Sequence, residues 1–147
     1  MKSVLRGTCL ILALAMLLAV PVSAQGGITP YASDYFTYTE TYLYIVDGNR
    51  FGIWFDVMAT RTMDELGVCS VTVRKSLDGE TWRNVKTFTP ENYPIMIATD
   101  TVYHADGLSY LGTYNCYYQA RVEFYAKRGT GSGIYVSYTP ILFLSVP

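Results

Sequence analysis

The sequence has few of the residues that most enzyme centres use. It contains one histidine and three cysteines among 147 residues. His104 alone cannot form a typical zinc site without several cysteine or carboxylate partners, and neither H-E-x-x-H nor a cysteine cluster occurs. The G-x-S-x-G sequence of many serine hydrolases is also absent. We therefore predict no catalytic residue, no metal site and no cofactor, and we expect His104 to lie at the surface or in a loop.

An excess of basic charge is also missing. The chain has 11 basic and 12 acidic residues, and the basic ones are scattered. Only Arg74-Lys75 and Lys127-Arg128 place two of them together, so no basic patch is expected. We predict no nucleic-acid partner.

The N-terminus has the features of a secretory signal peptide. Lys2 and Arg6 precede an apolar run from Cys9 to Val20, and Val22-Ser23-Ala24 fits a signal-peptidase site. The apolar run is shorter than the roughly 20 residues that a membrane-spanning helix needs. We predict a signal peptide at 1–24, a flexible lead-in at 25–35, and a secreted, extracellular product without membrane insertion.

One stretch, from Asn115 to Ala126, alternates between apolar and more polar residues with a period of two. Its apolar positions are Tyr118, Ala120, Val122, Phe124 and Ala126. This alternation is typical of a β-strand with one buried face and one solvated face. We predict that the stretch is the central strand of the fold and that its apolar set lies in the core.

A hairpin is predicted around Gly48-Asn49, the tip of a turn between two strand-like runs. The expected pairs are Val46 with Phe51, Tyr44 with Ile53, and Tyr42 with Phe55. We assign the face that carries these pairs to the core. Leu43 and Trp54 are then expected on the other face.

Further strand-like segments are separated by turn compositions. They lie at 68–74, 82–88, 101–111 and 134–144. The segment Thr62–Gly67, which precedes the first of them, is expected to be a connection. Within that first segment Cys69, Val71 and Val73 share one parity, and we assign them to the core.

The number and composition of these segments predict an all-β fold. All 14 tyrosines follow the signal peptide, in a part of the chain that is rich in threonine and valine. Nothing repeats and the segments are uneven in length, which favours two packed sheets over a barrel. We predict an immunoglobulin-like or fibronectin-type antiparallel β-sandwich of about seven strands, formed by a single domain over 36–147.

Two cysteines, Cys69 and Cys116, follow the signal peptide, and an exported pair favours a disulfide. If their strands are antiparallel neighbours, however, each cysteine begins its own strand, and the two lie at opposite ends. About five or six residues at ~3.4 Å each would then separate them, whereas a disulfide requires Cα atoms within ~7 Å. A disulfide between Cys69 and Cys116 and a pair of buried free thiols both remain open.

The segment Ser76–Trp82 resembles the Asp-box hairpin of sialidase-type propellers, although one residue is missing between its aspartate and its glycine. In such propellers the box repeats, whereas here it occurs once in a chain too short for a propeller. We therefore expect Asp78 and Gly79 to shape a turn, and Trp82 to pack on the sheet.

The solvated face of the central strand supplies the candidate binding residues. We expect Tyr125 to lie opposite Tyr135 on the following strand, with Tyr117 in the same row and Arg121 as a charged donor. Flat aromatic rows can hold sugar rings by stacking, but cross-strand tyrosines also stabilise sheets by themselves, by roughly 0.2–1 kcal/mol. Ligand binding by this row and a purely structural role are the two interpretations.

Three motifs together carry a resemblance to a known family. They are TMDELG at Thr62–Gly67, the turn at Ser76–Trp82, and the alternating strand at Tyr118–Ala126. With the sequence around them, over nearly the whole mature chain, they resemble a family of small exported bacterial domains, common in Gram-positive gut organisms, whose function is unassigned. The resemblance implies an immunoglobulin-like or fibronectin-type fold and no catalytic residue. Cys69 and Cys116 do not belong to its pattern.

Two classes of function follow from these observations. We expect a secreted, non-catalytic interaction or adhesion module that binds an extracellular protein or glycan, because sandwich domains display loops and sheet faces for binding. The alternative is a carbohydrate-binding module that uses the exposed tyrosine row. An enzyme is not expected.

Overall fold

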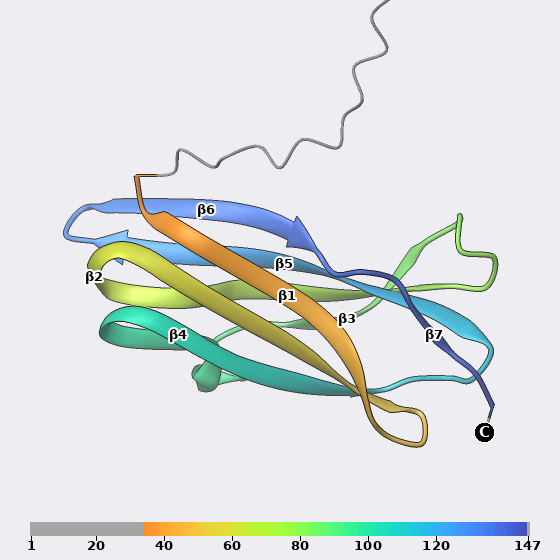
Figure 1. Ribbon diagram of the computed structural model, residues 1–147. Helices are drawn as coiled ribbons and strands as arrows, with labels where there is room; N and C mark the ends of the chain where they lie inside the picture. The colour runs from red at the N-terminus through yellow and green to blue at the C-terminus, as the bar shows by residue number, and fades with distance from the viewer. Residues whose placement is uncertain (1–33, 147) are drawn as a thin grey trace, which may run out of the picture. The chain divides into compact units, whose positions relative to one another are not determined.

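The computed structural model describes residues 34–146, in which all the regular structure apart from one short turn is β-strand (Figure 1). The strands are β1 (Phe36–Asp47), β2 (Arg50–Ser76), β3 (Arg83–Phe88), β4 (Ile97–Leu111), β5 (Cys116–Arg128), β6 (Gly131–Tyr138) and β7 (Leu142–Leu144). A single 3-10 turn, η1 (Pro94–Met96), precedes β4. Every strand pairing is antiparallel, which confirms the predicted all-β class. The predicted signal peptide at 1–24 and the lead-in as far as residue 33 lie outside the described residues.

β5 is the central strand that the alternation predicts. Buried and half-exposed residues alternate along it almost to its end. Val122 and Phe124 have no exposed surface, whereas their neighbours Arg121 and Glu123 are partly exposed. β2 pairs with one edge of β5, and both β6 and β7 pair with the other. The prediction of which β5 side chains enter the core is confirmed.

β2 runs for 27 residues and pairs with four other strands. Its first part pairs with β1 and β4, and its last part pairs with β3 and β5. The expectation that Thr62–Gly67 forms a connection is wrong, because the strand continues through it and Leu66 lies opposite Ala126 of β5. Gly67 allows the strand to pass close to η1, because its φ is +154° and a Cβ there would overlap the carbonyl oxygen of Met96.

The hairpin between β1 and β2 turns at Gly48-Asn49 as predicted, but its register differs by one residue along β1. Leu43, not Tyr44, lies opposite Ile53, because the pairing shifts next to the turn. A slip of one residue moves every side chain of a strand to the other face of the sheet. The assignment of Tyr42 and Tyr44 to the core is therefore wrong, and both are exposed.

The strands form one hydrogen-bonded sheet in the order β1-β2-β5-β6, with β3 and β4 paired to β2 and β7 paired to β5. In Figure 1 this sheet is curled, so that β1, the first part of β2 and β4 face β5 and β6. Apolar side chains from both parts meet inside the curl, where the ring of Phe51 on β2 lies 4.9 Å from the ring of Tyr118 on β5. Burial of these apolar side chains is the main force that stabilises the fold.

The segment Ser76–Trp82 forms a turn, as predicted. The carboxylate oxygen Oδ1 of Asp78 accepts three hydrogen bonds there. The donors are the backbone N–H of Thr81 at 2.7 Å, the hydroxyl of Ser76 at 2.7 Å and the backbone N–H of Glu80 at 2.9 Å. These hydrogen bonds hold the pKa of Asp78 well below its usual range. Trp82 packs against the guanidinium of Arg74, which lies 5.3 Å from the centre of its ring.

Cys69 and Cys116 are both free thiols. Cys69 lies beside Glu123, with its Sγ 3.5 Å from the carbonyl oxygen of that residue, seven positions along β5 from Cys116. That separation is about 24 Å, far beyond the reach of a disulfide. The pairing of β2 with β5 shifts at Cys69, so Val68 takes the core position that the sequence pattern assigns to Cys69.

Candidate binding face

The outer surface of β1, the first part of β2, and β4 carries a continuous group of large side chains, which we call the aromatic face. Its members are Tyr38, Tyr42 and Tyr44 on β1, Trp54 and Met58 on β2, and Tyr103 on β4. The strand register brings them together, because Tyr42 lies opposite Trp54, and Met58 lies between Tyr38 and Tyr103. The four tyrosines are between 39% and 46% exposed. This is a large exposed aromatic area for one sheet face.

A glycine on β2 lets one of the rings lie close against the sheet. Gly52 lies opposite Tyr44, and a Cβ at residue 52 would overlap the Tyr44 ring. Gly107 lies opposite Trp54, and a Cβ at residue 107 would be 3.6 Å from the Trp54 ring, an ordinary contact distance. The ring of Tyr42 stacks on Trp54, with centroids 6.4 Å apart and planes 28° apart. The three rings therefore form one connected surface on the sheet.

Two carboxylates lie within the same face. Glu40 and Asp56 are opposite each other on β1 and β2, an arrangement in which like charges destabilise a sheet. Tyr38 donates a hydrogen bond of 2.7 Å to Oε2 of Glu40, and Tyr103 donates one of 3.3 Å to Oδ2 of Asp56. No basic side chain within residues 34–146 pairs with either carboxylate. Oδ1 of Asp56 is shielded from solvent and has no hydrogen-bond partner among the described residues.

The hydroxyls of Tyr38 and Tyr103 are held in the protonated state by their surroundings. The hydrogen bond to Glu40, followed by desolvation and nearby negative charge, raises the pKa of Tyr38 to about 12. Desolvation and the charge of Asp56 raise the pKa of Tyr103. Both hydroxyls therefore act as donors to the carboxylates at neutral pH, and the carboxylates keep further lone pairs that can accept hydrogen bonds.

The row of tyrosines predicted on β5 and β6 is not continuous, because Tyr135 lies on the opposite face. β6 pairs with β5 so that Ile134, not Tyr135, is opposite Tyr125. The turn between these strands consists of Gly129-Thr130 alone and is shorter than the glycine loop that was expected. Tyr135 stacks instead on Phe124, with ring centroids 6.2 Å apart. Its predicted place in an exposed row is therefore wrong.

The other three residues of that row, Tyr117, Arg121 and Tyr125, do lie on the outer face of β5. Arg121 forms an ion pair with Glu123, and the hydrogen bond within this pair raises the pKa of Arg121. The ring of Tyr117 packs on Phe143 of β7, with centroids 4.7 Å apart. Since two of the three side chains already have partners within the chain, this face offers less to a ligand than the aromatic face does.

His104 is a packed strand residue rather than a surface or loop residue. Its Nε2 lies 2.8 Å from the carbonyl oxygen of Ile95, and its ring lies 5.7 Å from the ring of Phe55. These contacts tie β4 to η1 and to the core. Within residues 34–146 no three side chains of the kinds that bind metals are grouped closely enough to hold an ion.

Comparison of the chain with family models, with characterised proteins and with solved structures finds no match in any of the three. The similarity to small exported bacterial domains therefore stays a prediction. No helix in the described part of the chain has the length and apolar character needed to cross a bilayer. The geometry of the aromatic face is therefore the main indication of what the protein binds.

Proposed function

We propose that this chain is a non-catalytic extracellular binding module and that its aromatic face binds carbohydrate. The observation that carries the proposal is the connected surface of Tyr42, Tyr44 and Trp54, in which the Tyr44 ring lies directly over Gly52. A pyranose ring presents a flat face of C–H groups, which can stack on such rings and exclude water from both surfaces.

The two carboxylates explain how the same face could select a sugar over a purely apolar ligand. A carboxylate accepts hydrogen bonds and donates none when ionised, so Glu40 and Asp56 suit the hydroxyl groups at the edge of a sugar ring. Glu40 and Asp56 are like charges opposite each other, and no basic residue of the described chain neutralises them. Sugar hydroxyls that donate hydrogen bonds to the two carboxylates would partly compensate this negative charge. An unsatisfied buried acceptor such as Oδ1 of Asp56 is costly, and a donor that reaches it would remove that cost.

The location and fold type belong to the same proposal. We infer export from the signal-peptide features of residues 1–24, and an extracellular module would meet glycans of a cell surface or of the medium. We also propose that the curled sheet is an immunoglobulin-like or fibronectin-type sandwich, related to the small exported bacterial domains that the sequence resembles. The inward-facing rings of Phe51 and Tyr118, which pack between two parts of the sheet, support this interpretation.

The second candidate function is the binding of an extended protein strand by β6. β6 is at the end of the main strand order, and its sequence has no charged residue and no proline, which are the usual protections of an edge strand. Its residues Ile134, Val136 and Tyr138 are exposed. Strand addition at this edge would supply backbone hydrogen bonds as well as apolar contacts.

A glycan array followed by titration calorimetry tests the carbohydrate proposal. Tyr44→Ala and Tyr42→Ala should each weaken the binding of a glycan that the array identifies by about fivefold or more, which corresponds to about 1 kcal/mol for one stacked ring. Tyr138→Ala is the matched control, because Tyr138 is similarly exposed but lies on β6. Tyr138→Ala should leave the affinity for the glycan within about twofold of that of the unchanged protein.

Three results would contradict the proposal. The array could show no glycan binding, the Tyr138→Ala change could weaken binding as much as Tyr44→Ala does, or both tyrosine changes on β1 could lower stability while affinity stays the same. Release of reducing sugar from a bound oligosaccharide would contradict the non-catalytic part of the proposal alone. Binding of a protein that Tyr138→Ala abolishes would favour the second candidate.

A further inference from the structure

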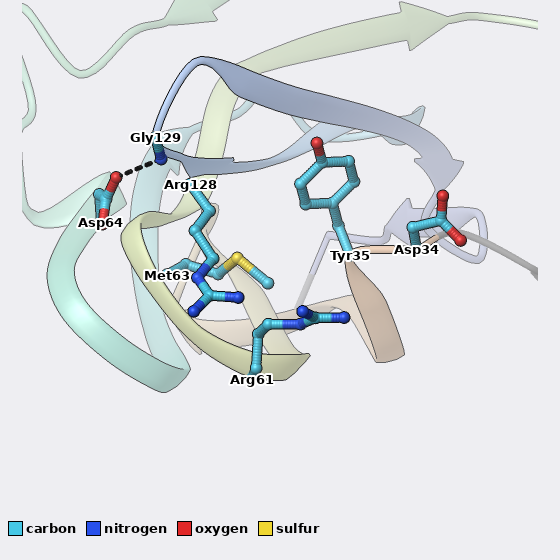
Figure 2. Close-up of a pocket in the computed structure, with 7 residues that line it drawn as sticks. All are labelled: Asp34, Tyr35, Arg61, Met63, Asp64, Arg128 and Gly129. Atoms are coloured by element: carbon cyan, nitrogen blue, oxygen red, sulfur yellow. Dashed lines mark hydrogen bonds between the residues drawn. The ribbon is translucent and has the colours of Figure 1, made fainter.

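A cavity of about 560 Å³ lies where the end of β5, the middle of β2 and the residues before β1 meet (Figure 2). Arg61 and Met63 of β2 and Arg128 of β5 line it, together with Tyr35 and Gly129. The volume falls within the range of about 300–1,000 Å³ that is usual for small-molecule sites. The cavity is separate from the exposed side chains of the aromatic face.

Hydrogen bonds between segments that are distant in sequence hold the walls of this cavity in place. Thr60 donates through its backbone N–H to the carbonyl oxygen of Tyr35 and through its hydroxyl to that of Asp34, both at 2.9 Å. The backbone N–H of Gly129 donates to Oδ2 of Asp64 at 2.6 Å. The backbone around the cavity is therefore held in place before any ligand arrives, which reduces the entropy cost of binding.

The two arginines of the cavity have no anionic partner in the described chain. The ion pairs found within residues 34–146 join Arg121 to Glu123 and Lys127 to Glu65, and neither Arg61 nor Arg128 takes part in one. No aspartate or glutamate precedes residue 34 in the sequence, so the N-terminal segment has no acidic side chain to offer them.

The two aspartates that line the cavity contribute negative charge to it but form no ion pair with either arginine. Asp64 is hydrogen-bonded to Gly129, and Figure 2 shows the carboxylate of Asp34 directed away from the guanidinium groups of Arg61 and Arg128. Two guanidinium groups that line the same cavity repel each other unless an anion lies between or beside them. Both arginines are exposed to solvent, and an anion from outside the chain that lay between their guanidinium groups would relieve this repulsion.

We propose that this cavity binds an oxyanion, a carboxylate or a sulfate, carried by a sugar or another small ligand. Arginine presents parallel N–H donors in a planar fork that matches the oxygen atoms of such groups and can bind them with two hydrogen bonds. Met63 and the ring of Tyr35 line the same cavity and provide apolar contact for the body of the ligand. The cavity is thus a second binding site, for acidic ligands, and it does not depend on the carbohydrate proposal for the aromatic face.

Isotope-edited NMR titration of the purified protein tests this site with three probes: glucuronate, glucose 6-sulfate and glucose. Binding of either anion should shift the amide signals of residues near 35, 61–64 and 128–129, whereas glucose at the same concentration should not. The anion that binds more tightly identifies the preferred oxyanion. Affinity should also fall as salt is added, because the interaction is between charges.

Arg61→Gln and Arg128→Gln should each reduce the affinity for the anion at least tenfold. Arg50→Gln is the matched control, since Arg50 is exposed at the first position of β2, away from the residues that line the cavity, and the substitution changes the net charge equally. It should leave the affinity within twofold, and unchanged amide spectra outside the cavity would show that the variants fold. The proposal is overturned if glucose shifts the amide signals of the cavity as strongly as the anions do, if neither anion binds, or if Arg50→Gln causes the same loss as Arg61→Gln. Failure of glucose to bind the aromatic face has no bearing on these outcomes.

Discussion

Phe124 should be one of the residues on which the stability of the fold depends most. It has no exposed surface, lies opposite Val68 of β2 and stacks on Tyr135 of β6. Phe124→Ala would leave a cavity bordered by three strands, and such truncations cost about 3–5 kcal/mol. A domain of 113 described residues is expected to have a total stability of about 6–17 kcal/mol. The substitution should therefore remove a large fraction of it.

Chemical denaturation measures this effect, and Phe143→Ala is the matched control. Phe143 is 46% exposed on β7 and packs on Tyr117 alone among the rings described, so the same truncation there should cost only about 0.5–1.5 kcal/mol. At roughly 4 °C for each kcal/mol, Phe124→Ala should lower Tm by about 12–20 °C and Phe143→Ala by about 2–6 °C. Equal losses in the two variants, or a loss below about 1.5 kcal/mol for Phe124→Ala, would refute the account of the core.

Three further predictions follow from individual contacts. Asp78→Asn should lower Tm near neutral pH, because the depressed pKa of the folded carboxylate contributes stability that is fully present above the unfolded value of 3.8. The difference should shrink as the pH falls from 3.8 toward the lower pKa of the folded carboxylate, and thermal melts in which it grew in acid would contradict this. Thr139→Val should cost about 1–3 kcal/mol in urea denaturation, since the Thr139 hydroxyl accepts a 2.9 Å hydrogen bond from the buried N–H of Ala120, whereas Thr139→Ser should keep most of the stability. Thiol titration under denaturing conditions should detect both Cys69 and Cys116, and the absence of both thiols from a monomer would contradict the pairing of β2 with β5.

The parts of the fold that the sequence predicts correctly are those where local patterns suffice. The period-two alternation of Tyr118–Ala126 is long and uninterrupted, so it identifies both the strand and its buried face. Gly48-Asn49 and Asp78-Gly79 are recognised as turns because their composition favours turn conformations. Each of these inferences depends on residues that are close together in the chain.

Three of the errors come from one-residue shifts that no local pattern reports. A shift in pairing beside the β1–β2 turn exposes Tyr42 and Tyr44. A shift at Cys69 places Val68, instead of Cys69, in the core. The short turn before β6 likewise moves Tyr135 to the inner face. β-Bulges and turn lengths depend on how distant strands fit together, so they follow from tertiary structure rather than from composition.

The same shifts explain why the aromatic face was not predicted. Tyr42 and Tyr44 alternate with Thr41 and Leu43, and aromatic size alone favours placing the tyrosines inside. The available signal was Gly52, since a glycine within a strand often marks a place where another group approaches closely. In the structure that group is the ring of Tyr44.

The length of β2 has a consequence for how the protein folds. Its hairpin with β1 can form early, because only a short turn separates the two strands, but its pairings with β4 and β5 join residues that are tens of positions apart. Chains dominated by such distant contacts fold slowly, in milliseconds to seconds, because much of the chain must be ordered before these contacts form. Because one strand supports β1, β3, β4 and β5 at once, none of these four strands has a complete set of neighbours without it, and the described residues should unfold in a single kinetic phase.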